Sequence, residues 1–256
     1  MLGPFDLKYF ALLALIFVPL ELLFPLHRRP TLRKRWWNDA LFMLGNVIPI
    51  TFGTVFLAIL MLQLAHMWVP PGVMAAVRSQ PLWLQVAEVI VSADIGFYLA
   101  HRAFHAVPFL WRFHAVHHSI EELDWLAAFR VHPLDQILTK SASFVPIAVL
   151  GFSDNAVLVF ALIYKWHSVA IHSNSRIGLG PLKWIFASPQ FHHWHHANEP
   201  AAMDKNFAGQ LSFLDWIGRT RHMPDAMPAR YGTGTPVPPY YHQQLISPFR
   251  RPNVAT

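Results

Sequence analysis

Long apolar stretches constrain the fold of this chain more than any other feature. Residues 9–26, 40–68 and 82–100 are almost wholly apolar. As helices rising about 1.5 Å per residue, they can cross most of a bilayer core of about 30 Å. Charged residues make up only 13% of the chain, about half the usual share of a soluble domain. We therefore expect an all-α, integral-membrane helical bundle, with the overlong second stretch tilted or kinked near Pro49 and Gly53.

The positions of the basic residues predict a topology. If the chain starts outside and crosses at these three stretches, only Lys8 and Arg78 of the 20 Lys and Arg residues lie on the outer side. The positive-inside rule predicts this bias. The net charge of +6 is then explained by topology, and nucleic acid is not expected as a partner. Residues 137–150 and 156–166 are shorter and are expected to form a hairpin that returns to the inner side.

The same pattern predicts three regions and a cellular location. Residues 1–80 are expected to form an N-terminal transmembrane region, residues 81–222 a catalytic region and residues 223–256 a C-terminal cytoplasmic tail. We expect a multi-pass protein with its histidines on the cytoplasmic face, and a bacterial inner membrane is favoured over the endoplasmic reticulum.

Twelve of the 16 histidines lie between His101 and His196, and eight of them fall into three clusters with helical spacing. Residues four apart share one helix face. The clusters are HxxxH at His101 and His105, HxxHH at His114, His117 and His118, and HxxHH at His192, His195 and His196.

Prolines mark the ends of the histidine-bearing helices. Pro108 should end the helix that carries the first cluster and let the second fold back toward it. Ser188 and Pro189 are typical of an N-cap and a first helical position, which predicts a short helix for the third cluster. His193 points in another direction on that helix and is interpreted as a non-ligand.

This spacing predicts metal binding. Imidazole suits Zn, Cu, Fe and Ni, and one helical turn lets two rings converge on one ion. Eight rings exceed the needs of one ion, so two metals are expected. Two neighbouring redox-active metals could activate O2, whereas zinc could not. Isolated histidines are more often surface or core residues, and we interpret His27, His66, His222 and His242 in that way.

Asp94 is a further candidate because an acid inside an apolar stretch is costly without a partner. It lies seven residues before His101, on the same helix face. We expect Asp94 to accept a proton from a ligand imidazole or a nearby Arg. The alternative is a simple salt bridge to Arg102 or Arg112.

Several segments resemble the fatty acid hydroxylase and sterol desaturase superfamily, over about residues 91–220. They are DIGFYLAHRAFH, LWRFHAVHHS, RVHPLD, IHSN and QFHHWHH followed by DKNFAG. The resemblance implies a membrane-bound di-iron centre at the cytosolic face. It adds His172 as a ninth ligand, with His167 as a weaker candidate. His132 and Asn174 are assigned to the second shell, and ligation by His132 stays open. Arg219 stands where the family pattern has glycine, which puts the shape of the cap and the substrate in doubt.

The resemblance also implies the reaction. A hydroxylase or desaturase would use two Fe ions and O2 on a fatty acyl, sterol or isoprenoid lipid, with the di-metal centre itself catalytic and zinc as an adventitious occupant. The sequence contains no flavin or nicotinamide fingerprint, so a reductase, ferredoxin or cytochrome b5-type carrier is expected to supply electrons. The alternatives are a metal transporter or metal-storage protein, and a dihaem electron-transfer protein. Few acids lie along the apolar stretches, and the clusters are too dense for single haem ligands.

Overall fold

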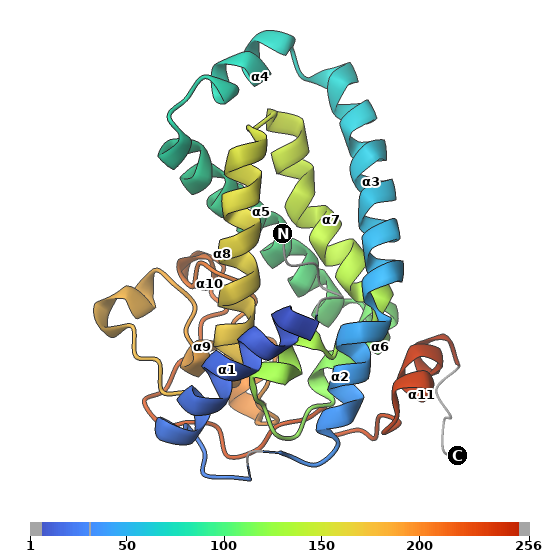
Figure 1. Ribbon diagram of the computed structural model, residues 1–256, viewed down its shortest axis with the longest axis vertical. Coiled ribbons are helices and arrows are strands. Elements are labelled where there is room, and N and C mark those ends of the chain that lie inside the picture. Colours follow the sequence, from blue (N-terminus) through green and yellow to red (C-terminus); the bar gives the residue numbers. More distant parts are fainter. Residues whose placement is uncertain (1–6, 31, 251–256) are drawn as a thin grey trace.

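The computed structural model describes residues 7–30 and 32–250, apart from the side chains of residues 65, 66 and 68. The interpretation of His66 therefore lies outside the described side chains. Within the described ranges the regular structure is helical. Helices α3 (Val47–Trp68), α7 (Pro133–Leu150) and α8 (Asp154–His172) run along the long axis, and α5 (Leu82–Ala106) crosses them obliquely (Figure 1). The predicted all-α class is confirmed.

Two of these helices are long and apolar enough to cross a membrane, namely α3 over Val47–Leu64 and α5 over Leu82–Ala106. Only 6% of the α3 window is buried. Phe52 and Phe56 on α3 are 74% and 68% exposed. An apolar helix face of this extent requires a non-aqueous surrounding, which agrees with a membrane protein. Helix α4 (Pro71–Arg78) connects the two helices at the end of the molecule far from the histidines (Figure 1).

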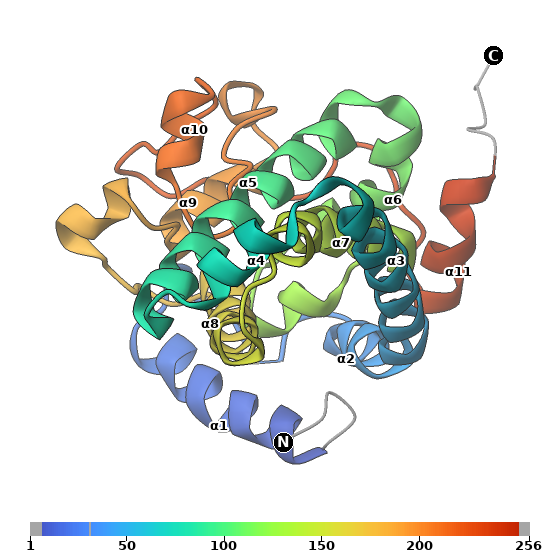
Figure 2. The same ribbon diagram turned by 90° about the horizontal axis from the view of Figure 1, so that it is seen from above.

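Helix α1 (Leu7–Leu23) differs from the predicted first span over residues 9–26. It lies obliquely across the lower half of the molecule instead of running beside α3 (Figures 1 and 2). Its buried residues Tyr9, Leu13 and Phe17 belong to one apolar cluster with residues of η1 (Trp125–Phe129) and α8. Glu21 accepts hydrogen bonds from the backbone amides of Trp125 and Asn174. One side of α1 therefore packs against the histidine end of the bundle, whereas Leu15 and Leu23 on its other side are 72% and 70% exposed.

The predicted stretch over residues 40–68 is divided into two helices, α2 (Trp36–Gly45) and α3. The division falls at Asn46, before the expected kink near Pro49 and Gly53. The Asn46 amide donates to the Val131 carbonyl at 2.7 Å, and its side-chain oxygen accepts from the Tyr241 hydroxyl at 3.1 Å. These long-range hydrogen bonds fix the chain at the break between α2 and α3. A local pattern of apolar residues does not reveal them.

Helices α7 and α8 form the predicted hairpin. They meet at Gly151, whose φ of 72° is the left-handed conformation that glycine adopts readily. Helix α7 therefore begins, and α8 ends, at the end of the molecule that contains α6 and α9 (Figure 1). Helix α5 packs closely on α7, since a Cβ on Gly96 would lie 2.2 Å from the Ala142 carbonyl oxygen. Glycine at this position lets the two backbones touch.

Short helices and loops cover the histidine end. They are α6 (Pro108–His118), η2 (Gly180–Trp184), α9 (Pro189–His195), η3 (Pro200–Ala202), α10 (Phe213–Ile217), α11 (Tyr241–Ile246) and η4 (Ser247–Phe249). The residues after 222 pack back onto this cap. The Tyr231 hydroxyl bonds His27 and His193, and Gln244 accepts from the Asn38 amide. The division into three regions stays a prediction, and contacts cross both of its boundaries.

Candidate metal centre

The three histidine clusters lie on three helices that converge. Helix α5 carries HxxxH and ends at Ala106, and α6 begins at Pro108 and carries the first HxxHH, as predicted. Helix α9 carries the second HxxHH, and the Ser188 hydroxyl caps it by accepting from the Phe191 amide. His172 is the last residue of α8. All nine predicted ligands fall into two neighbouring groups.

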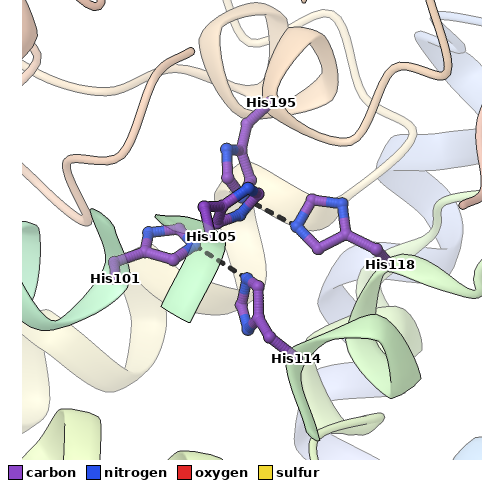
Figure 3. A group of neighbouring side chains, drawn as sticks. All are labelled: His101, His105, His114, His118 and His195. Atoms are coloured by element: carbon purple, nitrogen blue, oxygen red, sulfur yellow. Dashed lines mark hydrogen bonds between the residues drawn. The ribbon is translucent and has the colours of Figure 1, made fainter. Parts of the chain in front are cut away.

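The first is a five-histidine group, drawn from α5, α6 and α9 (Figure 3). Their candidate ligand nitrogens all lie within 4.8 Å of one another. The Nε2 atoms of His101 and His114 are 2.9 Å apart, and those of His118 and His195 are 3.0 Å apart. Two ligands at right angles on one ion, with bonds of about 2.1 Å, lie about 3.0 Å apart. The members are His101, His105, His114, His118 and His195.

The second is a four-histidine group, made by His117, His172, His192 and His196. The Nε2 atom of His172 lies 3.2 Å from that of His117 and 2.9 Å from that of His192. The rings of His118 and His196 stack at 4.5 Å between centroids, so the two groups adjoin. Two residues of the first HxxHH cluster, His114 and His118, belong to the five-histidine group, and His117 between them belongs to the four-histidine group.

Hydrogen bonds to Nδ1, the ring nitrogen that points away from the centre of the group, fix the tautomers of His117 and His172. The Nδ1 atoms of His117 and His172 lie 3.0 and 2.7 Å from the carbonyl oxygens of Arg130 and Ser168. A carbonyl only accepts, so each Nδ1 carries the proton and each neutral ring directs a bare lone pair from Nε2. These two lone pairs face each other at 3.2 Å. Such an arrangement is repulsive unless a cation lies between them.

Burial keeps these rings neutral. It lowers the pKa of His117 to about 4 and lowers the pKa of His118, His192 and His196 well below the usual value for histidine. The charged form is penalised because it loses its hydration. Among the described residues, the buried Nε2 atom of His105 has no hydrogen-bond partner. Neutral, converging and partly unsatisfied nitrogens are the donor set that a metal ion requires.

Asp135 is a functional residue that the sequence reasoning missed. Its buried carboxylate lies 2.7 Å from Nδ1 of His114, in the arrangement in which an acid orients a metal-binding histidine. The signal was present, because Asp135 ends the RVHPLD segment. His132 of the same segment belongs to neither group. It caps α7 by accepting from the Leu134 amide, so the open possibility of ligation finds no support.

The predicted partner of Asp94 was wrong. Its carboxylate accepts hydrogen bonds from the backbone amides of Gly209, Gln210 and Leu211 at 2.6 to 3.1 Å, and from no imidazole or guanidinium of the described residues. The loop approaches so closely that a Cβ on Gly209 would lie 2.9 Å from that carboxylate. Three consecutive loop amides therefore satisfy the carboxylate of Asp94.

The loop that Asp94 binds also contacts and orients one ring of the five-histidine group. Its residue Phe207 presents a carbonyl that accepts from Nδ1 of His101 at 2.7 Å. Asp215, also unpredicted, accepts the amides of Phe207 and Ala208 at 2.7 Å. Asp94 and Asp215 therefore position the ring of His101 through the backbone between them.

The remaining candidates lie outside both groups. The ring of His167 bonds the Ala187 carbonyl, and Asn174 bonds the backbone of His27 in both directions. His193, predicted as a non-ligand, bonds Tyr231 and the Ser173 carbonyl. These residues support the loops around the site without reaching its centre.

A cavity of about 490 Å³ borders both histidine groups. Its inner wall includes His101 and His114 of the first group and His117, His172 and His192 of the second. Apolar side chains from α2, α3, α7, α8 and η1 form most of the remaining wall, among them Phe42, Phe129, Phe144 and Phe160. An apolar molecule in this cavity would therefore lie directly against both histidine groups.

These features define a class of protein: a helical protein in which an apolar cavity borders two adjoining histidine groups that could each hold a metal ion. The fatty acid hydroxylase family matches residues 86–220. The chain belongs to this family, and the resemblance seen in the sequence is confirmed.

The chain is similar to a hydroxylase, a monooxygenase and a decarbonylase. Ornithine lipid hydroxylase OlsE of Rhizobium tropici is 31% identical over 67% of this chain and 52% of its own length. Human alkylglycerol monooxygenase is 36% identical over 51% of this chain and 29% of its own length. A very-long-chain aldehyde decarbonylase of rice is 27% identical over 57% of this chain and 26% of its own length. The match thus spans about half or less of these relatives, and no solved structure matches the chain.

Proposed function

We propose that this protein is an O2-dependent, di-iron lipid hydroxylase or desaturase. The observation that carries the proposal is the facing pair of Nε2 lone pairs on His117 and His172, within a nine-histidine site that borders an apolar cavity. The five-histidine and four-histidine groups would each hold one iron, and iron there would supply O2 activation. Zinc would be an adventitious occupant.

The chain's own residues would supply positioning and exclusion of water. The phenyl rings along the cavity would hold a fatty acyl, sterol or isoprenoid chain against the histidine groups. Asp135 and the carbonyls of Phe207 and Arg130 would keep the Nδ1 protons in place, so that Nε2 stays available to metal. A preorganised site of this kind needs no separate side-chain nucleophile.

The proposal includes a place in the cell and an electron source. The two apolar helices support a bilayer-embedded, multi-pass protein, with the histidine cap on the cytoplasmic face of a bacterial inner membrane. A reductase, ferredoxin or cytochrome b5-type carrier would dock on the cap and supply electrons.

Neighbouring histidines on α9 give a sharp test. His192 belongs to the four-histidine group, whereas His193 belongs to neither. We expect about two irons per wild-type chain, with O2-dependent conversion of a lipid when a reductase is added. His192→Ala should lose about one iron and the activity, and His193→Ala should keep both irons. Detergent-purified protein from iron-supplemented cells serves for elemental analysis. Folded wild-type protein without metal would overturn the proposal.

The alternative of a metal transporter or store makes a different prediction. A transporter needs polar ligands along a path between the two faces. The nine histidines instead gather at one end of the bundle (Figure 1). Metal uptake into vesicles that contain the protein, without lipid oxidation, would favour the transporter.

A further inference from the structure

The cavity beside the histidine groups contains two lysines that the proposed chemistry does not use. Lys140 on α7 and Lys165 on α8 both line it, on facing helices of the hairpin. The Lys165 ammonium lies 3.6 Å from the centroid of the Tyr9 ring. The two lysines are close enough for their charges to repel. An apolar cavity with two cations is unusual because charge is costly away from water.

No carboxylate of residues 7–30 and 32–250 forms an ion pair with either lysine. Asp135 is the one acid among the described residues that line the cavity, and it is engaged by His114. A further polar group at the wall is also unsatisfied: the buried hydroxyl of Thr54 on α3 has no partner in the described structure. Two cations and a free hydroxyl are the groups that bind an anionic oxygen ligand.

The lysines lie at similar heights above the metal site. Lys140 is five residues beyond Asp135 on α7, about 7.5 Å along the helix axis, and Lys165 is seven residues before His172 on α8, about 10.5 Å. Gly53 packs against Ile137, three residues before Lys140, so Thr54 lies within about one helical turn of the level of Lys140. An anionic group seated there would leave the rest of a lipid within reach of the histidines.

We propose that Lys140 and Lys165 bind the carboxylate or phosphate of an anionic lipid, so that the reacting carbon lies several bonds from the charged group. The inference rests on the proposed function for its substrate role, but the anion site can be tested without catalysis. Both ligand sources share charged oxygen atoms that accept hydrogen bonds from ammonium groups. Neutral lipids of the same chain length lack this interaction.

Three ligands that share one chain and differ only in the head group test the proposal: oleic acid, oleyl phosphate and oleyl alcohol. Binding is measured at pH 7 on iron-loaded, detergent-purified full-length protein. We expect wild type to bind at least one anionic ligand about tenfold or more tightly than the alcohol. Lys140→Met and Lys165→Met should each weaken that binding about tenfold and leave the alcohol unchanged. The preferred anion identifies the source as carboxylate or phosphate.

Control variants separate charge from fold. Lys140→Arg should retain the preference for the anion, and Lys183→Met, on η2 outside the cavity, should change nothing. Iron content equal to wild type shows that each variant is folded. Equal binding of all three ligands by wild type, or an undiminished preference in both Met variants, overturns the proposal. Head-group selectivity without bound iron would refute the di-iron function and leave the anion site standing.

Discussion

At the scale of single residues, Asp135 shows how a site depends on groups that bind no metal. Its contact with Nδ1 of His114 fixes the ring that directs Nε2 into the five-histidine group. We expect Asp135→Asn, which keeps the shape but replaces one carboxyl oxygen with an amide nitrogen and so weakens the acceptor for the His114 ring, to weaken metal retention about tenfold or more. Metal release to a chelator, followed by elemental analysis, measures the effect. Asp154→Asn removes an exposed acid at the far end and should leave release unchanged. Equal rates for both variants would contradict a role for Asp135.

The backbone conformation at Arg219 explains why the family pattern has glycine at this position. It follows α10 with a φ of 57°, in the left-handed region where a side chain clashes with its own backbone. The expected glycine would fit this conformation, and Arg219 is exposed. We predict that Arg219→Gly raises the free energy of unfolding by up to about 1 kcal/mol. Thermal unfolding in detergent measures this, with Arg219→Ala as the control that keeps the strain. A lower melting temperature for Arg219→Gly would refute the argument.

The sequence predicted which histidines meet but not what orients them. Helical spacing is local, so the positions of His101 and His105, or of His192 and His196, follow from four-residue steps. The carbonyls of Arg130, Phe207 and Lys205 that accept from the rings carry no signature, because every residue has a carbonyl. The partner of Asp94 was missed for the same reason, since backbone amides more than 100 residues away are invisible to a pattern of side chains.

At the scale of elements, the crossing of α5 over α7 determines where the HxxxH cluster, His101 and His105, lies. Gly96 lets the helices touch, and an added Cβ would meet backbone atoms that cannot rotate away. We predict that Gly96→Ala lowers the stability by about 1–3 kcal/mol, despite the higher helix propensity of alanine. It should also reduce iron content, because α5 carries His101 and His105.

Gly72 supplies the matched control for that crossing. It lies in the first turn of α4, and a Cβ there would meet nothing within 4 Å. Gly72→Ala should therefore be neutral or slightly stabilising. Thermal unfolding and elemental analysis of both variants compare the positions. If the two substitutions had the same effect, close packing at Gly96 would not be what holds α5 on α7.

Helix prediction succeeded for elements whose ends have local signals and failed where tertiary contacts decide. Pro108 and the Ser188–Pro189 pair marked the starts of α6 and α9 correctly. Asn46 divides α2 from α3 through bonds to Val131 and Tyr241, which lie far along the chain. For α1 the predicted membrane span stays a prediction, because the helix has both an apolar side that packs on η1 and α8 and an exposed apolar side.

At the scale of the whole molecule, the arrangement predicts how the protein lies in a bilayer. Helix α4 and the histidine cap occupy opposite ends of the long axis (Figure 1). Helices α3 and α5 connect those ends, whereas α1 lies across the half that contains the cap (Figure 1). The two ends should therefore face opposite sides of the membrane, and the start of α1 should share the side of the cap.

The absence of cysteine from the sequence makes this arrangement directly measurable, because single introduced cysteines have no background. We expect Arg78→Cys on α4 to react with a membrane-impermeant maleimide in spheroplasts that retain an intact inner membrane. Asp225→Cys in the cap should react only in inverted vesicles, and Lys8→Cys should follow Asp225→Cys because α1 packs on η1 and the end of α8, in the half that contains the cap. Labelling after detergent lysis controls for reactivity. Reaction of Lys8→Cys on the side of Arg78→Cys would instead establish α1 as a span, and reaction of all three from one side would contradict the embedding of α3 and α5.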